Sequence, residues 1–212
     1  MSDADPTPIR LMIADDHYFV RMGLADSLRD EPDFDVIGEA ESGGQAIVMY
    51  RDLQPDVLIL DLMLGDMRGD EVLAELKNVT DGPVFCVMLS VNEGEEDIHR
   101  CVREGAKAYL SKTAPREDLI RAVRTVSQGE EYFLPAIRAK LSQREQRSDL
   151  TPRELQTLRC LVAGLSNREI AKELQISEAT AKLHVGNLLQ KLDVMDRTQA
   201  VTAAIERGWV HL

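Results

Sequence analysis

The stretch DVLILDLML at residues 56–64 decides the class of fold. Its first half, at 57–60, is a short apolar run of the kind found in strands buried on both faces, and an aspartate follows it at once. Four similar runs alternate with stretches of helical period, which is the pattern of a parallel sheet with crossover helices. Strands are predicted at 9–14, 34–39, 57–60, 84–89 and 108–110, and helices near 18–30, 43–52, 69–77, 94–104 and 115–128. The expected fold is a doubly wound, five-stranded α/β domain.

Carboxylates follow the first and third predicted strands. Asp15 and Asp16 come directly after the first strand, and Asp61 directly after the third. Ligand sites of doubly wound sheets lie beyond the carboxyl ends of the strands, so with these two strands adjacent the three carboxylates meet at one rim. Clustered carboxylates raise one another's pKa unless a cation joins them, and an all-oxygen site with open positions suits Mg²⁺. The sequence therefore predicts a magnesium site at this rim.

Two further strand ends add a hydroxyl and an ammonium group. Ser90 follows the fourth strand, and Lys112 lies two residues after the fifth. An Asp61 carboxylate beside a divalent cation, an ammonium and a hydroxyl is arranged to attack phosphorus, because each neighbour offsets charge on the phosphoryl oxygens. Singly, such an aspartate is more often a turn or cap residue, and a lone lysine is usually a solvated charge. Their combination at four strand ends predicts formation of an aspartyl phosphate.

The first 128 residues or so resemble the receiver domain of two-component response regulators, a flavodoxin-like fold. The resemblance rests on ADD at 14–16, DVLILDLML at 56–64, LS at 89–90 and GAKAYLSK at 105–112. It implies that Asp61 is the phosphoacceptor and that Ser90 and Lys112 contact the phosphoryl group. It also implies that Mg²⁺ is bound by Asp16, Asp61 and the backbone carbonyl of Met63, with Asp15 assisting through water.

The resemblance assigns a switch role to one aromatic residue. Tyr109, three residues before Lys112, matches the side chain that moves inward when the hydroxyl residue, here Ser90, is drawn toward the phosphate. The other interpretation is an ordinary half-buried aromatic of a strand.

Two positions depart from the receiver pattern. Leu64-Gly65 replaces the usual Met-Pro, and the loop after the acceptor is expected to be more mobile because it lacks the φ restraint of proline. Val91 stands where the family usually has Ala, and its β-branched side chain is expected to narrow access to the phosphorylation pocket. Val91→Ala should therefore change the rate of phosphorylation or of phosphate loss, which time courses of both proteins would measure.

The chain changes character after residue 128. Residues 129–149 lose strand character, contain Pro135 and become polar, as a linker between domains would; one amphipathic stretch near 136–146 leaves its helicity open. From residue 150 the apolar period is helical. The expected division is a phosphoacceptor domain at 1–128, a linker at 129–149 and a small all-α four-helix domain at 150–212.

Four residues mark helix starts in this second domain. Thr151, Ser166 and Asp196 are each followed three residues later by Glu or Gln, the pattern in which two side chains satisfy each other's backbone amides. Ser177 begins a further helix without such a partner. Ser166 and Ser177 lie 11 residues apart, which is helix-turn-helix spacing.

The helix after Ser177 has one apolar and one polar face. Its apolar stripe, predicted to face the core, consists of Ala181, Val185, Leu188, Leu189 and Leu192. The other face presents Lys182, which can reach a guanine edge or a phosphate, and Leu183, which suits a thymine methyl. Thr180 and Asn187 can bind phosphates and so position the protein. From spacing alone, a surface helix with ordinary solvated residues is an equal alternative.

Residues 150 to about 208 resemble the LuxR-type DNA-binding domain, through LTPRELQTLRCLVAGLSNREIAKELQISEATAKLHVGNLLQKLDV and DRTQAV. Together with the receiver, this makes the whole chain similar to the NarL/FixJ class of transcription regulators. The resemblance implies that Lys182 and Leu183 contact bases, with Thr180 and Asn187 near the DNA backbone. Gly186 departs from the pattern, because relatives often carry a basic residue there.

Charge is divided unevenly along the chain. The formal net charge is −12, of which residues 150–212 carry +1 and residues 1–149 carry −13. A domain of charge +1 should bind DNA weakly as a monomer, since phosphate neutralisation supplies much of the affinity. Weak monomeric binding favours a second copy. The resemblance implies, as partners, a histidine kinase, promoter DNA, a second copy on phosphorylation and RNA polymerase. The last helix, around 197–207, has small apolar surface either for a two-fold contact or for core packing only.

Two other functions remain open beside a phosphorylation-controlled transcription regulator. A hydrolase that uses Asp61 as nucleophile would resemble Asp-x-Asp, but Met63 occupies the second position and removes the general acid. A constitutive DNA-binding dimer would leave the acidic cluster without use. The sequence has no run of about 20 apolar residues and begins with an acidic MSDADPTPIR that lacks the features of a secretory signal, so a cytoplasmic, non-enzymatic switch is expected.

Overall fold

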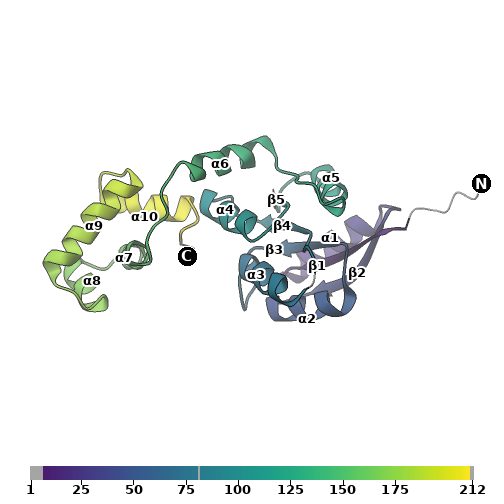
Figure 1. The fold of residues 1–212 in the computed structure, drawn as a ribbon, viewed down its shortest axis with the longest axis horizontal. Coiled ribbons are helices and arrows are strands. Elements are labelled where there is room, and N and C mark those ends of the chain that lie inside the picture. Colours follow the sequence, from purple (N-terminus) through teal and green to yellow (C-terminus); the bar gives the residue numbers. More distant parts are fainter. Residues whose placement is uncertain (1–6, 81, 211–212) are drawn as a thin grey trace, which may run out of the picture. The chain divides into compact units, whose positions relative to one another are not determined.

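The computed structural model describes residues 7–80 and 82–210, so most of the N-terminal stretch used above to judge targeting lies outside the described residues. Two compact units divide the chain (Figure 1). The first comprises the chain up to Asn92 together with Ile98–Ala139, and the second comprises Glu93–Asp97 and the chain from Lys140 onward. No helix among the described residues is long and apolar enough to cross a bilayer.

The first unit is built on five parallel strands in the order β2-β1-β3-β4-β5. The strands are β1 (Ile9–Ala14), β2 (Phe34–Ala40), β3 (Val57–Asp61), β4 (Cys86–Ser90) and β5 (Ala108–Ser111). The intervening helices are α1 (Tyr18–Arg29), α2 (Gly43–Leu53), α3 (Gly69–Val79), α4 (Glu95–Arg103) and α5 (Arg116–Ser127). This is the doubly wound sheet that the sequence predicts, with β1 beside β3 as the site requires.

Burial on both faces explains why the strands read as continuous apolar runs. On one face, strand residues such as Leu11, Ile59 and Val87 form a core with residues of α1 and α5. The alternate residues, such as Met12 and Leu58, are fully buried too, on the side covered by α2 and α3. Two predicted boundaries are wrong by two residues: α3 continues to Val79, and β4 begins at Cys86 and not at residue 84. Cys86 pairs with Leu58, so residue 84 would lie opposite residue 56, which precedes the start of β3.

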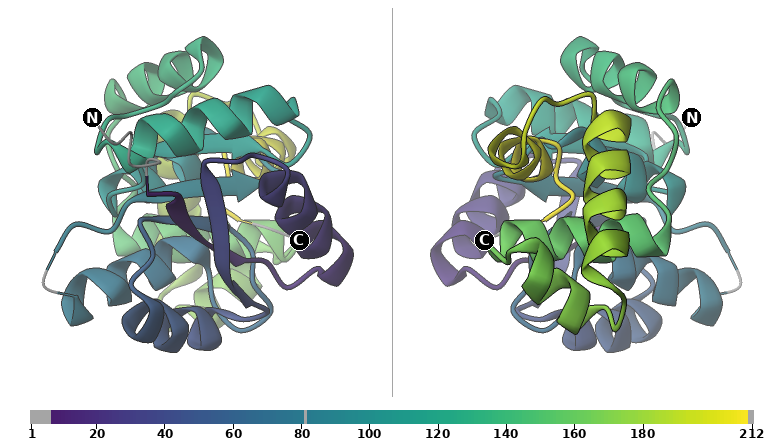
Figure 2. Two further views of the ribbon diagram at one scale, coloured as in Figure 1. Left: turned by 90° about the vertical axis from the view of Figure 1, so that its right-hand side faces the viewer. Right: turned by 90° about the vertical axis from the view of Figure 1, so that its left-hand side faces the viewer.

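The second unit contains four helices around their own core, green to yellow in Figure 2. They are α7 (Pro152–Val162), α8 (Asn167–Glu173), α9 (Glu178–Leu192) and α10 (Arg197–Glu206); a further helix, α6 (Pro135–Glu145), precedes them. The core cluster is formed by residues from all four, including Leu158, Ile170, Leu188 and Ala204, and Trp209 packs against it. The predicted small all-α domain is therefore confirmed.

The helix starts follow the predicted capping residues with one exception. Thr151 and Ser166 each accept a hydrogen bond from the backbone of the glutamate three residues on, and each glutamate reaches back to the cap amide. Ser177 caps α9 alone. The prediction for Asp196 is half wrong: Asp196 caps α10, but Gln199 accepts from the amide of Met195, one residue earlier than a capping box requires.

Candidate functional site

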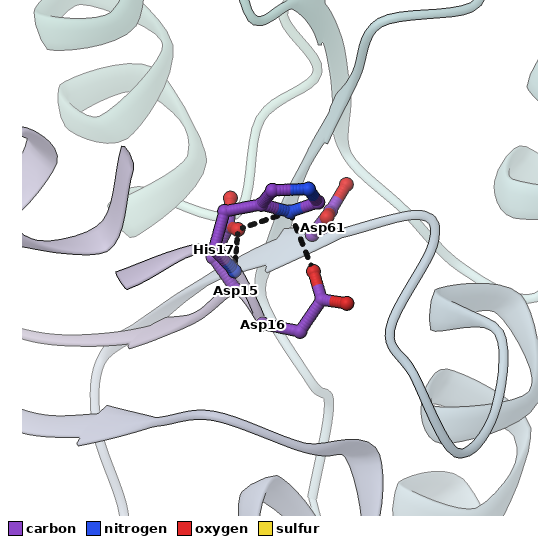
Figure 3. Close-up of side chains that lie close together, drawn as sticks. All are labelled: Asp15, Asp16, His17 and Asp61. Atoms are coloured by element: carbon purple, nitrogen blue, oxygen red, sulfur yellow. Dashed lines mark hydrogen bonds and ion pairs between the residues drawn. The ribbon is translucent and has the colours of Figure 1, made fainter. Parts of the chain in front are cut away.

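Three carboxylates meet at the carboxyl-terminal rim of the sheet, as the sequence predicts. Asp15 directly follows β1 and Asp61 ends β3; both side chains are almost fully buried, whereas that of Asp16 is partly exposed. One ligand atom from each of these residues and from His17 lies within 4.8 Å of the others (Figure 3). The parallel order of β1 and β3 is what brings residues 46 positions apart together.

Lys112 links two of these carboxylates. Its Nζ lies 2.7 Å from Oδ2 of Asp15 and 2.7 Å from Oδ2 of Asp61, and it donates a hydrogen bond to Asp61. Burial raises the pKa of Asp61; Lys112 opposes that rise, while the charge of Asp15 adds to it. Burial alone would lower the pKa of Lys112, but its contacts with the two carboxylates outweigh burial and raise it. The ammonium thus holds a buried carboxylate pair whose mutual repulsion would otherwise favour protonation.

Ser90 and Tyr109 share contacts with a single loop residue. The Ser90 hydroxyl, which is buried at the end of β4, accepts a hydrogen bond of 3.0 Å from the amide of Asn92. The Tyr109 ring is fully buried, and its hydroxyl donates a hydrogen bond of 2.7 Å to the carbonyl of Asn92. Within the described residues no hydrogen bond joins Ser90 Oγ to the carboxylates; the Ser90 carbonyl instead accepts from the Lys112 amide. Tyr109 occupies an inward position.

Met63 lies against Asp61 through its backbone. A backbone hydrogen bond from Met63 lowers the pKa of Asp61, against the larger effect of burial. The Met63 sulfur accepts a contact of 3.5 Å from the Arg68 guanidinium, so the side chain turns to the loop and not to the carboxylates. Val91 is 69% exposed, which places its β-branched side chain at the surface beside the end of β4.

An aspartate anchors the loop that was expected to be more mobile for lack of proline. The Asp66 carboxylate accepts hydrogen bonds of 2.7 Å and 2.9 Å from the amides of Gly43 and Gly44, at the start of α2. These bonds hold the pKa of Asp66 below its ordinary value. An isolated bridge between Met63 and Arg68 closes the loop on itself. The loop is therefore restrained by side-chain capping of a neighbouring helix in place of the missing proline.

Two residues that the sequence analysis missed support the pocket. The nearly buried Arg21 donates a hydrogen bond of 2.5 Å to the carbonyl of Asp15, which fixes the end of β1. Gly69 lies so close to the end of β3 that a Cβ there would come within 2.5 Å of the Asp61 carbonyl. The role of Arg21 follows from its burial, and the role of Gly69 follows from the close approach of two backbone segments. Neither feature can be recognised in the sequence, which shows only an arginine and a glycine.

The donor set fits a small, hard divalent cation. Carboxylate oxygens are the ligands that Mg²⁺ prefers, and three carboxyl groups here face one position. The buried Oδ2 of Asp15 accepts no well-aligned hydrogen bond among the described residues, although the Lys112 ammonium lies beside it. Gly65 leaves room on the open side, since a Cβ there would lie 3.6 Å from Oδ2 of Asp16. The acidic pocket is therefore consistent with a metal site.

The second candidate site is the outer face of α9. The predicted apolar stripe faces inward: Ala181, Leu188 and Leu192 are buried, and Val185 and Leu189 pack against the same core. The predicted contact residues Lys182, Leu183 and Asn187 are all exposed, and Leu183 is 62% exposed. Thr180 differs, because it is half-buried and its hydroxyl shares a hydrogen bond with Ser177 at the helix start.

The eight basic residues from position 150 onward fall into two groups. Arg153, Lys191, Arg197 and Arg207 are engaged with partners inside the unit, namely backbone carbonyls or the carboxylate of Glu154. In the described part of the chain, the remaining four form no hydrogen bond or ion pair; these are Arg159, Arg168, Lys172 and Lys182. Lys182 is thus a free cation on the outer face of α9, and Arg168 and Lys172 lie on the preceding helix.

Comparison with known proteins decides the family. Residues 11–124 match the response regulator receiver domain, and residues 148–204 match the bacterial regulatory proteins of the luxR family. The chain belongs to the two-component response regulators. It is 36% identical over 209 residues to the response regulator protein VraR of Staphylococcus aureus, covering 96% of this chain and 99% of the relative. This response regulator is of the NarL/FixJ class, a family of transcription factors and not of metabolic enzymes.

Solved structures agree with the assignment. The response regulator ChrA of a heme-sensing two-component system is 35% identical, covers 96% of this chain and 99% of its own, and superposes with a TM-score of 0.57. RcsB from Salmonella enterica serovar Typhimurium, solved on promoter DNA with a phosphomimetic, covers 94% and 99% with a TM-score of 0.73. At 24% identity, the likeness of RcsB to this response regulator shows the shared fold.

Proposed function

We propose that a histidine kinase phosphorylates Asp61 with Mg²⁺ bound in the acidic pocket, and that this modification controls dimerisation and sequence-specific DNA binding. The observation that carries the proposal is the Lys112 ammonium 2.7 Å from both Asp15 and Asp61, at the rim where three strands end. Asp15, Asp16, Asp61 and the Met63 carbonyl would hold the ion, which would neutralise charge on the phosphoryl oxygens. The Lys112 ammonium would neutralise charge on the phosphoryl oxygens from the other side of the pocket.

The transfer step places one carboxylate oxygen of Asp61 on phosphorus. That oxygen forms the new bond while the bond from phosphorus to the imidazole nitrogen of the kinase phosphohistidine breaks, and the electron pair returns to the imidazole. The Lys112 ammonium is already in place, so no reorganisation is needed as negative charge arrives. Ser90 is positioned at the end of β4 to contact a phosphoryl oxygen once its hydroxyl leaves the Asn92 amide.

The path from the pocket to the loop runs through Asn92. Ser90 and Tyr109 bind the amide and the carbonyl of this one residue, so a Ser90 hydroxyl that turns toward phosphate changes a loop that the tyrosine also holds. We assign the switch role to this pair. Replacing Tyr109 with Phe removes the second bond and keeps the ring, and is expected to uncouple phosphorylation from DNA affinity without slowing phosphorylation.

The DNA-reading element is α9. Its 15 residues span about 22 Å, enough to lie in a major groove. Lys182 and Leu183 are the base-contacting candidates, and Thr180 and Asn187 face the backbone. Most small apolar surface of α10 is used in the core, where Ala200 and Ala204 are fully buried. A second copy would double the phosphate contacts that a nearly neutral domain lacks.

The hydrolase alternative is disfavoured by the second position of the acceptor motif. Met63 places a thioether two residues after Asp61, and that sulfur accepts a contact from Arg68. A thioether cannot donate a proton to a leaving group or activate water. The structure offers the constitutive alternative no support, because the pocket is fully assembled around Asp61 and Lys112.

The kinase needs a surface beside the acceptor, and α1 offers one. This helix begins two residues after Asp16 and exposes Tyr18, Phe19 and Met22, at 59%, 79% and 40%. Phe19 and Lys112 both line a groove of about 300 Å³. We assign kinase docking to this face, because the phosphodonor must bring phosphorus to a nearly buried carboxylate. Phe19→Ser should slow transfer from the kinase and leave phosphorylation by a small donor unchanged; equal slowing of both would contradict the assignment.

The remaining assignments follow from these. A kinase partner, promoter DNA and RNA polymerase place the protein in the cytoplasm. Functionally, we divide the chain into a receiver at 1–128, a linker at 129–149 that includes all of α6, and a DNA-binding domain at 150–212.

The test uses the full chain and Asp61→Asn, with Asp52→Asn as a control that alters an exposed carboxylate on α2, away from the pocket. Each protein is incubated with Mg²⁺ and a small phosphodonor, and intact mass, oligomeric state and DNA binding are compared. Wild type and the Asp52 variant should each gain one phosphoryl group, dimerise and bind DNA more tightly, whereas Asp61→Asn should do none of these. Rapid donor turnover would indicate a hydrolase, and DNA binding independent of phosphate would indicate a constitutive binder.

A further inference from the structure

His17 is a pocket residue that the proposed function does not use. It follows the aspartate pair directly, and its imidazole Nδ1 lies 2.7 Å from Oδ1 of Asp16 and 3.4 Å from Oδ1 of Asp15 (Figure 3). Its own backbone amide donates a hydrogen bond of 2.9 Å to Oδ1 of Asp15, which fixes the start of the side chain relative to the pocket. Two-thirds of the side chain is exposed, so packing does not account for the position of the ring.

The contacts of Nδ1 with the two carboxylates are at ion-pair distance, and the same spacing is that of ligands in one coordination shell. Adjacent ligands of an octahedral ion with bonds of about 2.1 Å lie about 3 Å apart. The Nδ1 atom of His17 lies 2.7 Å from the nearest oxygen of Asp16 and 3.4 Å from that of Asp15, one distance slightly below and one slightly above this value. Asp61 closes the group, with all four ligand atoms within 4.8 Å of one another. A single ion can therefore contact the imidazole nitrogen together with the carboxylates.

We propose that His17 is a nitrogen ligand of the receiver's metal ion, and that it makes the pocket a mixed nitrogen and oxygen site favouring first-row transition ions, such as Mn²⁺ and Co²⁺, over Mg²⁺. The inference rests on the proposed function only in requiring that the pocket binds a divalent ion. Imidazole is a poor ligand for Mg²⁺, whereas transition ions accept nitrogen readily and bind mixed sites more tightly. His17 would raise affinity for them alone.

The test measures ligation directly on the full-length chain with Mn²⁺ alone. Electron spin echo envelope modulation of bound Mn²⁺ reports a directly coordinated ¹⁴N nucleus, and electron paramagnetic resonance of free Mn²⁺ gives the dissociation constant. Mg²⁺ affinity is obtained by competition. Three variants accompany wild type: His17→Gln, His184→Gln as a matched histidine change on α9, and Asp16→Asn as a change to a carboxylate ligand.

Wild type and His184→Gln should show ¹⁴N modulation, and His17→Gln should lose it. The affinity of His17→Gln for Mn²⁺ should fall about tenfold, while its affinity for Mg²⁺ changes less than about threefold. Bound Mn²⁺ without ¹⁴N modulation in wild type, or an equal loss of both ions in His17→Gln, would overturn the inference and leave the magnesium site standing. Failure of wild type to bind either ion, or unaltered binding by Asp16→Asn, would instead refute the metal site itself.

Discussion

The acidic pocket and the outer face of α9 use charge in opposite ways. In the pocket, Asp15, Asp61 and Lys112 are largely withdrawn from water and depend on one another. On α9, Lys182 and Leu183 face solvent and touch little else of the protein. Buried interdependent charges make a site that one substitution disables, whereas exposed ones contribute separately and in smaller increments. The difference implies that the switch is sensitive to single changes and the DNA surface is adjustable.

The largest effect should come from removing the shared cation. Lys112→Met leaves two buried carboxylates facing each other, and unfolding free energy should fall by about 3–5 kcal/mol, the cost of leaving a buried charge unpaired. Urea unfolding followed by circular dichroism measures this loss. Mg²⁺ should restore more stability to the variant than to wild type, because the ion replaces the missing positive charge. A loss below about 1 kcal/mol would contradict the interdependence of these charges.

A smaller loss is expected where the backbone passes close behind the acceptor. Gly69→Ala puts a methyl group 2.5 Å from the Asp61 carbonyl and should destabilise the first unit by about 1–3 kcal/mol while slowing phosphorylation. Gly23→Ala is the matched control on α1, because no atom lies within 4 Å of the added Cβ, and it should stabilise by up to about 1 kcal/mol. Hydrogen exchange resolved by mass spectrometry locates each effect. Equal behaviour of the two variants would remove the steric argument.

On the DNA surface, two lysines of the same helix should behave differently. Lys182→Ala should weaken DNA binding by about 1–3 kcal/mol, because Lys182 is free to contact DNA. Lys191 is held by Glu154 at 2.7 Å, so Lys191→Ala should cost some stability and leave DNA affinity nearly unchanged. Fluorescence anisotropy at several salt concentrations checks both. Equal losses of DNA affinity would show that the internal pairing does not decide which cations are available.

The smallest effect concerns acid stability of the second unit. Burial would raise the pKa of Glu154, but hydrogen bonds from Lys191 and Thr151 outweigh burial and lower it. A lowered pKa contributes stability above the ordinary value of 4.5, and that stability is lost as pH falls below it. Unfolding followed by Trp209, the single tryptophan, should show a loss of about 1 kcal/mol or less across this range. Glu154→Gln should flatten the curve; an unchanged slope would contradict the assignment.

Much of both sites could be predicted from sequence because strand ends and caps leave local signals. Asp15, Asp61 and Lys112 each stand at the end of an apolar run, and parallel topology alone brings them together. Thr151 and Ser166 likewise mark the starts of their helices, because each is followed three residues later by a glutamate. These predictions needed only the period of the chain and the rule that ligand sites lie at strand exits.

The remainder depended on distances that no local pattern encodes. Arg21 is an ordinary helical arginine in sequence, and only the folded structure places it on the carbonyl of Asp15. Asp66 caps α2, whose first residue precedes it by 23 positions, so the loop lacking proline was expected to be freer than its contacts imply. The Gln199 side chain accepts from the amide of Met195 and not from that of Asp196, a difference of one residue that the spacing of the two residue types does not encode.

The most direct test of the central claim is the position of the phosphoryl group on the wild-type chain. After treatment with Mg²⁺ and a phosphodonor, reduction by borohydride converts an aspartyl phosphate to homoserine, and tandem mass spectrometry of the tryptic peptide 52–68 locates it. Homoserine should appear at position 61 and not at Asp52, Asp56 or Asp66, which the same peptide contains. Modification at one of those three, or none in the presence of Mg²⁺, would contradict the account.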